Sequence, residues 1–504
     1  MRRSNGGIIG PDNVTTGGFT GVASGVWKLN EVTDLIKQSK WPEPSPFPIN
    51  VTPNSARFNI ASSDNLTRTS DSGNKKTFTM SFWVKRSTLG TDQVLTNITA
   101  PSGAQGRVFF EGNTEQLEFH DVSSGGSYEI RYITNRLFRD FSAWYNIVIA
   151  VDTEDGTAGD RVKIYVNGVQ ETSFATATQP SSGLVTSFNS GGVMEIGSQQ
   201  VPAEFFGGYM SEVINVDGSQ LAPTSFGEFN SGSGIWIPKT ITGLTFGANG
   251  YYLKFTNASA LGEDFSGNDN DFTVNNLTSL DQSTDSPSNN FCTIINASSA
   301  SKAYTLLEGN LKVTASANNW YGVPRGSIGV SSGKWYYEIK VTDENDNFMV
   351  GYMSASNLAD VGDRQTNGFP KLNGFQSSGY VKRQDDTEVN ISGSFQWNDG
   401  DIAQIALDMD NKKLWIGKNN SYYNSGNPAT GSNETIGSSY FTAGEAYLPA
   451  LIFFETNDGS FNFGSPPYAI SSGNTDGNGF GNFEYALPSG YLSLNTKNLA
   501  AVLG

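Results

Sequence analysis

The side chains best suited to binding chemistry are aromatic residues in polar, turn-rich stretches. Sugar rings stack their apolar faces on Trp and Tyr, while Asn and Asp bind sugar hydroxyls. The predicted ligand-binding residues are Trp320 and Tyr321 in SANNWYGVPRG, and Tyr422 and Tyr423 in KNNSYYNSGN. For Tyr422 and Tyr423, exposure to solvent without any role in binding is an equal alternative. Trp397, in FQWNDGD, is expected in a core instead.

The acidic run DFSGNDNDF is a second candidate site. Asp264, Asp269 and Asp271 supply closely spaced oxygen ligands of the kind that calcium prefers. The spacing differs from that of the EF-hand loop, and an Asp/Asn/Gly turn is the commoner explanation of such a run. We therefore expect no required cofactor, and a structural calcium ion at these three residues stays open beside the turn.

The residues that catalysis most often uses are scarce. The single histidine, His120, lies two residues after Glu118 in QLEFHDV, and the alternation predicts that it points outward from a strand as a surface residue. No Gly-x-Ser-x-Gly motif accompanies it. The one cysteine, Cys292, has no base beside it in the sequence. We predict no catalytic residues and no enzymatic activity.

Composition and charge exclude several classes of partner. The 504 residues include 32 basic and 49 acidic side chains, which give a formal charge of −17. This charge opposes binding to nucleic acid or anionic lipid. No apolar run has the length of a signal peptide or of a bilayer span. We expect a soluble protein with no nucleic-acid partner and no membrane insertion.

Apolar residues alternate with polar ones in two long regions, which predicts antiparallel strands. The residues that share one face are Phe78, Met80, Phe82 and Val84 in the first region, and Trp335, Tyr337, Ile339 and Val341 in the second. Many short strands with few helices favour sheet-on-sheet packing. We predict an all-β protein with two antiparallel β-sandwich (jelly-roll) domains in tandem and a short N-terminal helical anchor.

The pattern divides the chain into five segments. They are an N-terminal anchor or assembly segment (1–49), a first sandwich (50–230), a connector (231–293), a second sandwich (294–470) and a C-terminal docking segment, expected as a strand (471–504). In the first segment, Val32, Leu35 and Ile36 form the apolar stripe of a short helix. That stripe needs a neighbouring surface, on either the next domain or another chain.

Two family resemblances follow from the strand order. FTMSFWVKR, AWYNIVIAVD, DRVKIYVNGVQ and GYMSEVINVDG resemble the laminin G-like, concanavalin-type jelly roll. SGKWYYEIKV, FMVGYMSAS, WNDGDIAQIALDMDNKKLWIGKNN and YLPALIFFETNDGSFNFG resemble the SPRY domain. The first resemblance implies carbohydrate or protein binding, and some relatives are glycan hydrolases. Their Glu-x-Asp-x-x-Glu pattern begins here only at Glu344 and fails at Met349. The second resemblance implies a recognition module.

The whole arrangement, from GVASGVWKLNEVTDLIKQSKWP through the connectors DFSGNDNDFTVNN and LDQSTDSPSNNF, resembles virion appendage proteins of tailed bacteriophages, especially phages of marine bacteria. The resemblance implies a structural virion protein, a tail fibre or a tail or capsid appendage, made in the host cytoplasm without a signal peptide. It would bind a host-surface polysaccharide or outer-membrane protein during adsorption.

The same resemblance implies the other partners. They are other virion proteins, bound through the N-terminal segment, and further copies of the chain, with a trimer by analogy. A virion-associated glycan depolymerase and a purely architectural capsid decoration protein stay open as alternatives.

Overall fold

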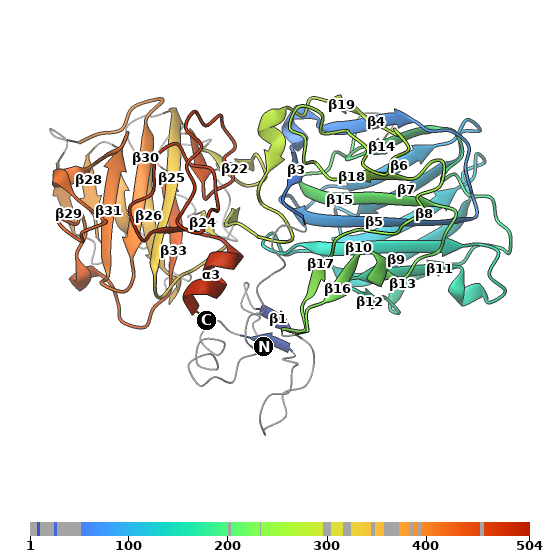
Figure 1. Ribbon diagram of the computed structural model, residues 1–504, viewed down its shortest axis with the longest axis horizontal. Coiled ribbons are helices and arrows are strands. Elements are labelled where there is room, and N and C mark those ends of the chain that lie inside the picture. The colour runs from blue at the N-terminus through green and yellow to red at the C-terminus, as the bar shows by residue number, and fades with distance from the viewer. Residues whose placement is uncertain are drawn as a thin grey trace, which may run out of the picture. The chain divides into compact units, whose positions relative to one another are not determined.

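The protein folds into two compact units, Met1–Ser288 and Asn289–Gly504 (Figure 1). The computed structural model describes residues 8–10, 25–27, 52–199, 203–231, 233–295, 304–315, 324–343, 348–356, 372–377, 379–383, 387–391, 395–453 and 458–503. Of the predicted anchor it describes only β1 (Ile8–Gly10) and β2 (Gly25–Trp27), which pair antiparallel. The helix predicted at Val32, Leu35 and Ile36 lies outside the described residues. No helix in the described part of the chain is long and apolar enough to cross a bilayer.

The first unit contains two antiparallel sheets of eight strands each. Sheet 1 has the order β12 (Val169–Gln170), β11 (Val162–Val166), β10 (Tyr145–Asp152), β5 (Thr77–Arg86), β15 (Gly208–Asp217), β3 (Ser55–Phe58) and β20 (Gln282–Ser283), and β18 (Tyr251–Leu253) pairs with β15. Sheet 2 has the order β13 (Phe174–Thr178), β9 (Tyr128–Leu137), β8 (Gln116–Val122), β7 (Gln105–Phe110), β6 (Gln93–Thr99), β14 (Val193–Ile196), β4 (Asn65–Thr69) and β19 (Thr273–Asn275).

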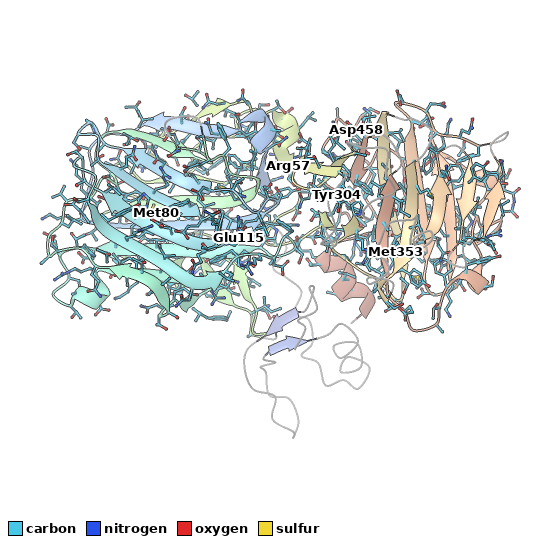
Figure 2. All side chains as sticks on the ribbon, turned by 180° about the vertical axis from the view of Figure 1, so that it is seen from behind. Arg57, Met80, Glu115, Tyr304, Met353 and Asp458 are labelled. Carbon is cyan, nitrogen blue, oxygen red and sulfur yellow. The ribbon has the colours of Figure 1, made fainter. Side chains whose placement is uncertain are left out.

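The core of the first unit is built from the predicted alternation. Phe78, Met80, Phe82 and Val84 on β5 all lie in one apolar cluster and are at most 1% exposed (Met80 is labelled in Figure 2). Leu117 and Phe119 on β8 join the same cluster, so the inner faces of the two sheets meet there. The sandwich predicted for this region is confirmed.

The segment predicted as a connector belongs largely to the first unit. Its strands β18, β19 and β20 extend sheets 1 and 2, and β17 (Trp236–Pro238) pairs with β16 (Gly227–Phe229). The carboxylate of Asp285 accepts from Lys85 Nζ at 2.7 Å and from Trp144 Nε1 at 3.1 Å. The Lys85 and Asp285 side chains are each 1% exposed. This buried ion pair fastens the end of the segment to β5, and the unit ends at Ser288 rather than near residue 230.

The second unit also contains two sheets. Sheet 3 has the order β21 (Ile294–Ile295), β24 (Arg325–Gly326), β33 (Tyr447–Phe453), β26 (Phe348–Ser354), β27 (Leu372–Gln376), β28 (Tyr380–Lys382) and β29 (Glu388–Asn390). Sheet 4 has the order β22 (Tyr304–Leu307), β23 (Lys312–Ala315), β34 (Asp458–Asn462), β25 (Lys334–Asp343), β30 (Ile402–Asp408), β31 (Lys413–Lys418) and β32 (Ser421–Tyr422), and β35 (Leu492–Ser493) pairs parallel with β25. The predicted core face, Trp335, Tyr337, Ile339 and Val341, is completely buried, and Trp397 is 1% exposed.

The C-terminal segment docks on sheet 4, but its apolar end is a helix. Glu338 on β25 accepts hydrogen bonds from the backbone N–H groups of Glu484 at 3.0 Å and Tyr485 at 2.9 Å. The last residues form α3 (Thr496–Leu503) instead of the expected strand. The side chain of Asn495 accepts from the N–H of Asn498 at 2.9 Å, which caps the helix, and Leu and Ala are strong helix formers.

Three buried carboxyl groups in the first unit have strongly raised pKa values. Burial raises the pKa of Asp121, Glu195 and Glu212 to about 7 in each case. Glu195 accepts a hydrogen bond from Asn97 Nδ2 at 2.6 Å, which offsets only part of the cost of burial. Each group holds its proton in the folded state at a pH where the unfolded chain has lost it. The free energy of unfolding therefore falls as the pH rises from about 4.5 to about 7.

We expect Glu195→Gln to stabilise the first unit at pH 8 and to change little at pH 4.5. Glutamine keeps an oxygen for Asn97 and has no proton to lose. A pKa shift from 4.5 to about 7 sets an upper bound of about 3 kcal/mol on the gain. Thermal denaturation from pH 4.5 to 8 measures it, with the exposed Glu228→Gln as the control. Parallel pH profiles for wild type and Glu195→Gln would contradict this assignment.

Candidate functional site

A pocket of about 530 Å³ lies on the face of sheet 2 that points away from the core. On β8, Leu117 and Phe119 face the core, so Glu118 and His120 face the pocket. The pocket is lined by Gln105, Arg107 and Phe109 from β7, by Glu118, His120 and Val122 from β8, by Tyr128 and Arg131 from β9, and by Asp92, Glu111, Asn113, Thr114 and Gly126 from the adjoining loops.

A β-bulge brings Tyr128 to the pocket. The register between β8 and β9 shifts between Asp121 and Val122, so that Val122 pairs with Tyr128 while Asp121 pairs with Ile130. The extra residue moves Tyr128 onto the same face as Arg131. Tyr128 is 45% exposed, so part of this aromatic residue is open at the pocket.

Glu118 organises the centre of the pocket. One carboxylate oxygen, Oε1, accepts from His120 Nδ1 at 2.6 Å and from Arg131 Nε at 3.0 Å, and Oε2 accepts from Arg131 Nη2 at 3.0 Å. Burial alone would raise the pKa of Glu118, but the hydrogen bonds from His120 and Arg131 outweigh it and lower the pKa to about 2. Glu118 is therefore a permanent anion that positions both partners.

Ring contacts fix the same side chains from the sides. The His120 ring lies edge-on between Phe109, at a centroid distance of 5.6 Å, and Tyr128, at 5.4 Å. The Arg131 guanidinium stands 4.4 Å from the centre of the Tyr128 ring. With Nδ1 held by Glu118, the ring leaves Nε2 for a ligand in the pocket.

Glu111 is a second carboxyl group of the pocket, in the turn that follows β7. It accepts from Thr114 Oγ1 at 2.6 Å and interacts electrostatically with Glu118. Burial and the neighbouring Glu118 raise the pKa of Glu111. Glu111 and Glu118 are therefore neighbouring carboxyl groups whose pKa values are shifted in opposite directions.

The predicted direction of the His120 side chain is confirmed, but its predicted exposure to solvent is wrong. The ring points away from the core, as the alternation predicts, but it is only 6% exposed. The side chains of β7 and β9 enclose it. The spacing of Glu118 and His120 in QLEFHDV was the one sequence signal for this site, because residues two apart share a face.

The predicted ligand-binding aromatics lie elsewhere. Trp320 and Tyr321 lie outside the described residues. Tyr422 packs beside Trp415 and Tyr491 on sheet 4, and its hydroxyl is buried, which differs from the exposed ring expected. Tyr423 is half-buried, with its ring 5.8 Å from that of Phe395. The structure places neither tyrosine at the pocket.

The residues predicted to bind calcium lie in a loop in which Asp264 and Asp271 accept hydrogen bonds from nearby backbone N–H groups. Asp264 accepts from the N–H groups of Tyr252, Ser266 and Asn270 at 2.7 to 2.9 Å. Asp271 Oδ1 accepts from the Asp264 N–H at 2.8 Å, and Asp269 adopts a positive φ of 56°. These contacts match the Asp/Asn/Gly turn. The described residues contain no group of three or more His, Cys, Asp or Glu side chains placed to hold a metal ion.

Comparison with known proteins places the pocket in a concanavalin-like domain. Residues 61–217 match the model of the Concanavalin A-like lectin/glucanases superfamily, a laminin G family. This match confirms the fold expected for the first unit, and such a domain is compatible with glycan binding. No curated protein matches the sequence.

Many solved structures match parts of this chain, among them the following three. The SPRY domain of human HERC1 is 17% identical with a TM-score of 0.25, covering 32% of this chain and 92% of that one. A heptameric SAP-like pentraxin from Limulus polyphemus is 13% identical with a TM-score of 0.27, covering 34% and 80%. Domain 4 of the arabinanase AbnA from Geobacillus stearothermophilus, in complex with arabinotriose, is 19% identical with a TM-score of 0.22, covering 30% and 65%.

Proposed function

We propose that this protein binds glycans through the pocket on sheet 2. The observation that carries the proposal is a pocket of about 530 Å³ on a concanavalin-like sandwich, with a fixed Glu118, His120 and Arg131 constellation at its centre. Saccharide sites combine an aromatic surface with a few oriented polar groups. Tyr128 supplies the surface, and the side chains of Gln105 and Asn113 add amide groups to the lining.

We propose binding without cleavage. Glu118 is held as an anion by His120 and Arg131, so it has no proton to give to a leaving oxygen. Burial and Glu118 raise the pKa of the neighbouring Glu111, so a reducing-end assay on the bound glycans tests whether these two carboxyl groups cleave them.

The wider role that we propose is that of a structural protein of a tailed-phage virion, in a tail fibre or in a tail or capsid appendage. The sequence resemblance to such appendages supports it. The protein would bind host-surface polysaccharide during adsorption, with its N-terminal segment attached to other virion proteins. An outer-membrane protein is the alternative host ligand. Several copies on one particle, in a trimer by analogy, would convert modest affinity at each pocket into strong adhesion.

We expect Tyr128→Ala to weaken glycan binding by about fivefold, because an aromatic contact of this kind contributes on the order of 1 kcal/mol. An array of neutral, carboxylated and sulfated oligosaccharides, followed by calorimetry on those that bind, measures the change. Phe229→Ala is the matched control, since Phe229 is 52% exposed and lies outside the pocket. A reducing-end assay on the bound glycans should show no cleavage. Equal affinity of the two variants would exclude the pocket.

The virion role predicts that gold-labelled antibody against this chain decorates intact phage particles in electron micrographs. Label at the tail supports host recognition, and label over the capsid supports decoration. Unlabelled particles, with label restored by denaturing the virions, would mean an internal protein, and particles unlabelled in both states would contradict the virion role.

A further inference from the structure

Three nitrogen-bearing side chains form a row across sheet 2. Arg107 on β7 pairs directly with His120 on β8, and His120 pairs directly with Arg131 on β9. Directly opposed residues in antiparallel strands have Cβ atoms about 5 Å apart. All three line the pocket. The row places the two arginines of the pocket on either side of His120, in a chain with 32 basic and 49 acidic residues.

Each member of the row keeps a polar atom that no described protein group uses. Arg131 binds Glu118 through Nε and Nη2, which leaves Nη1. Arg107 binds Glu204 through Nη1 at 2.7 Å and Gln199 through Nη2, and its buried Nε has no hydrogen-bond partner. His120 keeps Nε2. The existing hydrogen bonds and ion pairs therefore orient the row, and each of its side chains keeps a polar atom without a partner among the described residues.

Two of the three acidic groups of the pocket lie toward one end of it, and the third, Glu118, lies beside the row. Glu111 and Asp92 lie at or beside the turn between β7 and β8, where Asp92 Oδ1 accepts from the Gly112 N–H at 2.7 Å. Both oxygens of Glu118 are turned to His120 and Arg131. A ligand that spans the pocket thus meets carboxyl groups suited to sugar hydroxyls at one end and the two arginines of the row in the middle.

We propose that Arg107 and Arg131, on either side of His120, bind the anionic substituent, a carboxylate or a sulfate ester, of an acidic polysaccharide, with His120 Nε2 between them as an acceptor for a sugar hydroxyl. Arginine donors in fixed orientation match both kinds of oxyanion. The formal charge of −17 repels an anionic polymer at long range, so selectivity has to come from this local row. The inference rests on the proposed glycan binding and names the class of glycan.

The test compares each acidic oligosaccharide with its own neutral form by calorimetry on the full chain. One arm uses an oligouronate and its carboxyl-reduced derivative, and the other uses a sulfated oligosaccharide and its desulfated derivative. We expect one acidic form to bind at least about tenfold tighter than its neutral partner, as charge-assisted hydrogen bonds imply. The arm in which this occurs identifies the anion.

Variants tie the preference to the row. Arg107→Gln should abolish the difference between the acidic and neutral forms, and Arg107→Lys should restore part of it. Arg136→Gln is the matched control, because Arg136 lies on the same sheet as Arg107, likewise pairs with a glutamate, Glu171, and does not line the pocket. Equal binding of acidic and neutral forms to wild type, or loss of the preference in Arg136→Gln alone, would overturn this inference while leaving glycan binding intact. Absence of binding to every oligosaccharide would instead overturn the proposed function.

Discussion

Glu118 is a carboxylate with a 1% exposed side chain on the middle strand of the pocket, and three hydrogen bonds from His120 and Arg131 hold it in its charged form. A carboxylate removed from water is costly unless donors replace the lost hydration. Here those donors are the same side chains that line the pocket. The bonds that make the buried charge tolerable therefore also fix the His120 ring and the Arg131 guanidinium before a ligand arrives. Pre-organisation of this kind lowers the entropy cost of binding.

The core of the molecule could be predicted because burial on one face of a strand leaves a period of two in the sequence. Met80 in the first unit and Trp335 in the second lie where that period places them. The pocket could be predicted only in part. The sequence puts Glu118 and His120 on one face, but their partners come from other strands, and the register that brings Arg131 beside them depends on turns and on the bulge at Val122. The sequence pattern instead predicts turn-flanked aromatics such as Tyr422 as binding residues, because local polarity does not show which side chains pack over a ring.

Long-range packing also explains the two segments whose structure differs from expectation. The stretch before residue 288 is rich in turn residues, yet Asp285 is buried against Lys85, which lies 200 residues earlier in the chain. In the second unit, Glu338 in sheet 4 accepts hydrogen bonds from two backbone N–H groups of the C-terminal segment. In both cases a polar group on a strand needs a partner that only a distant segment supplies, and a local pattern carries no sign of that need.

The most direct test of this account is the long-range proton–nitrogen NMR spectrum of the imidazole, because His120 is the single histidine of the 504-residue chain and its signal reports on the pocket alone. The spectrum is recorded at neutral pH with and without a saturating acidic oligosaccharide. The account predicts a proton fixed on Nδ1, where Glu118 accepts it, and a change at Nε2 when the glycan enters. A proton on Nε2 with a bare Nδ1, or an Nε2 signal that a saturating bound glycan leaves unmoved, would contradict it.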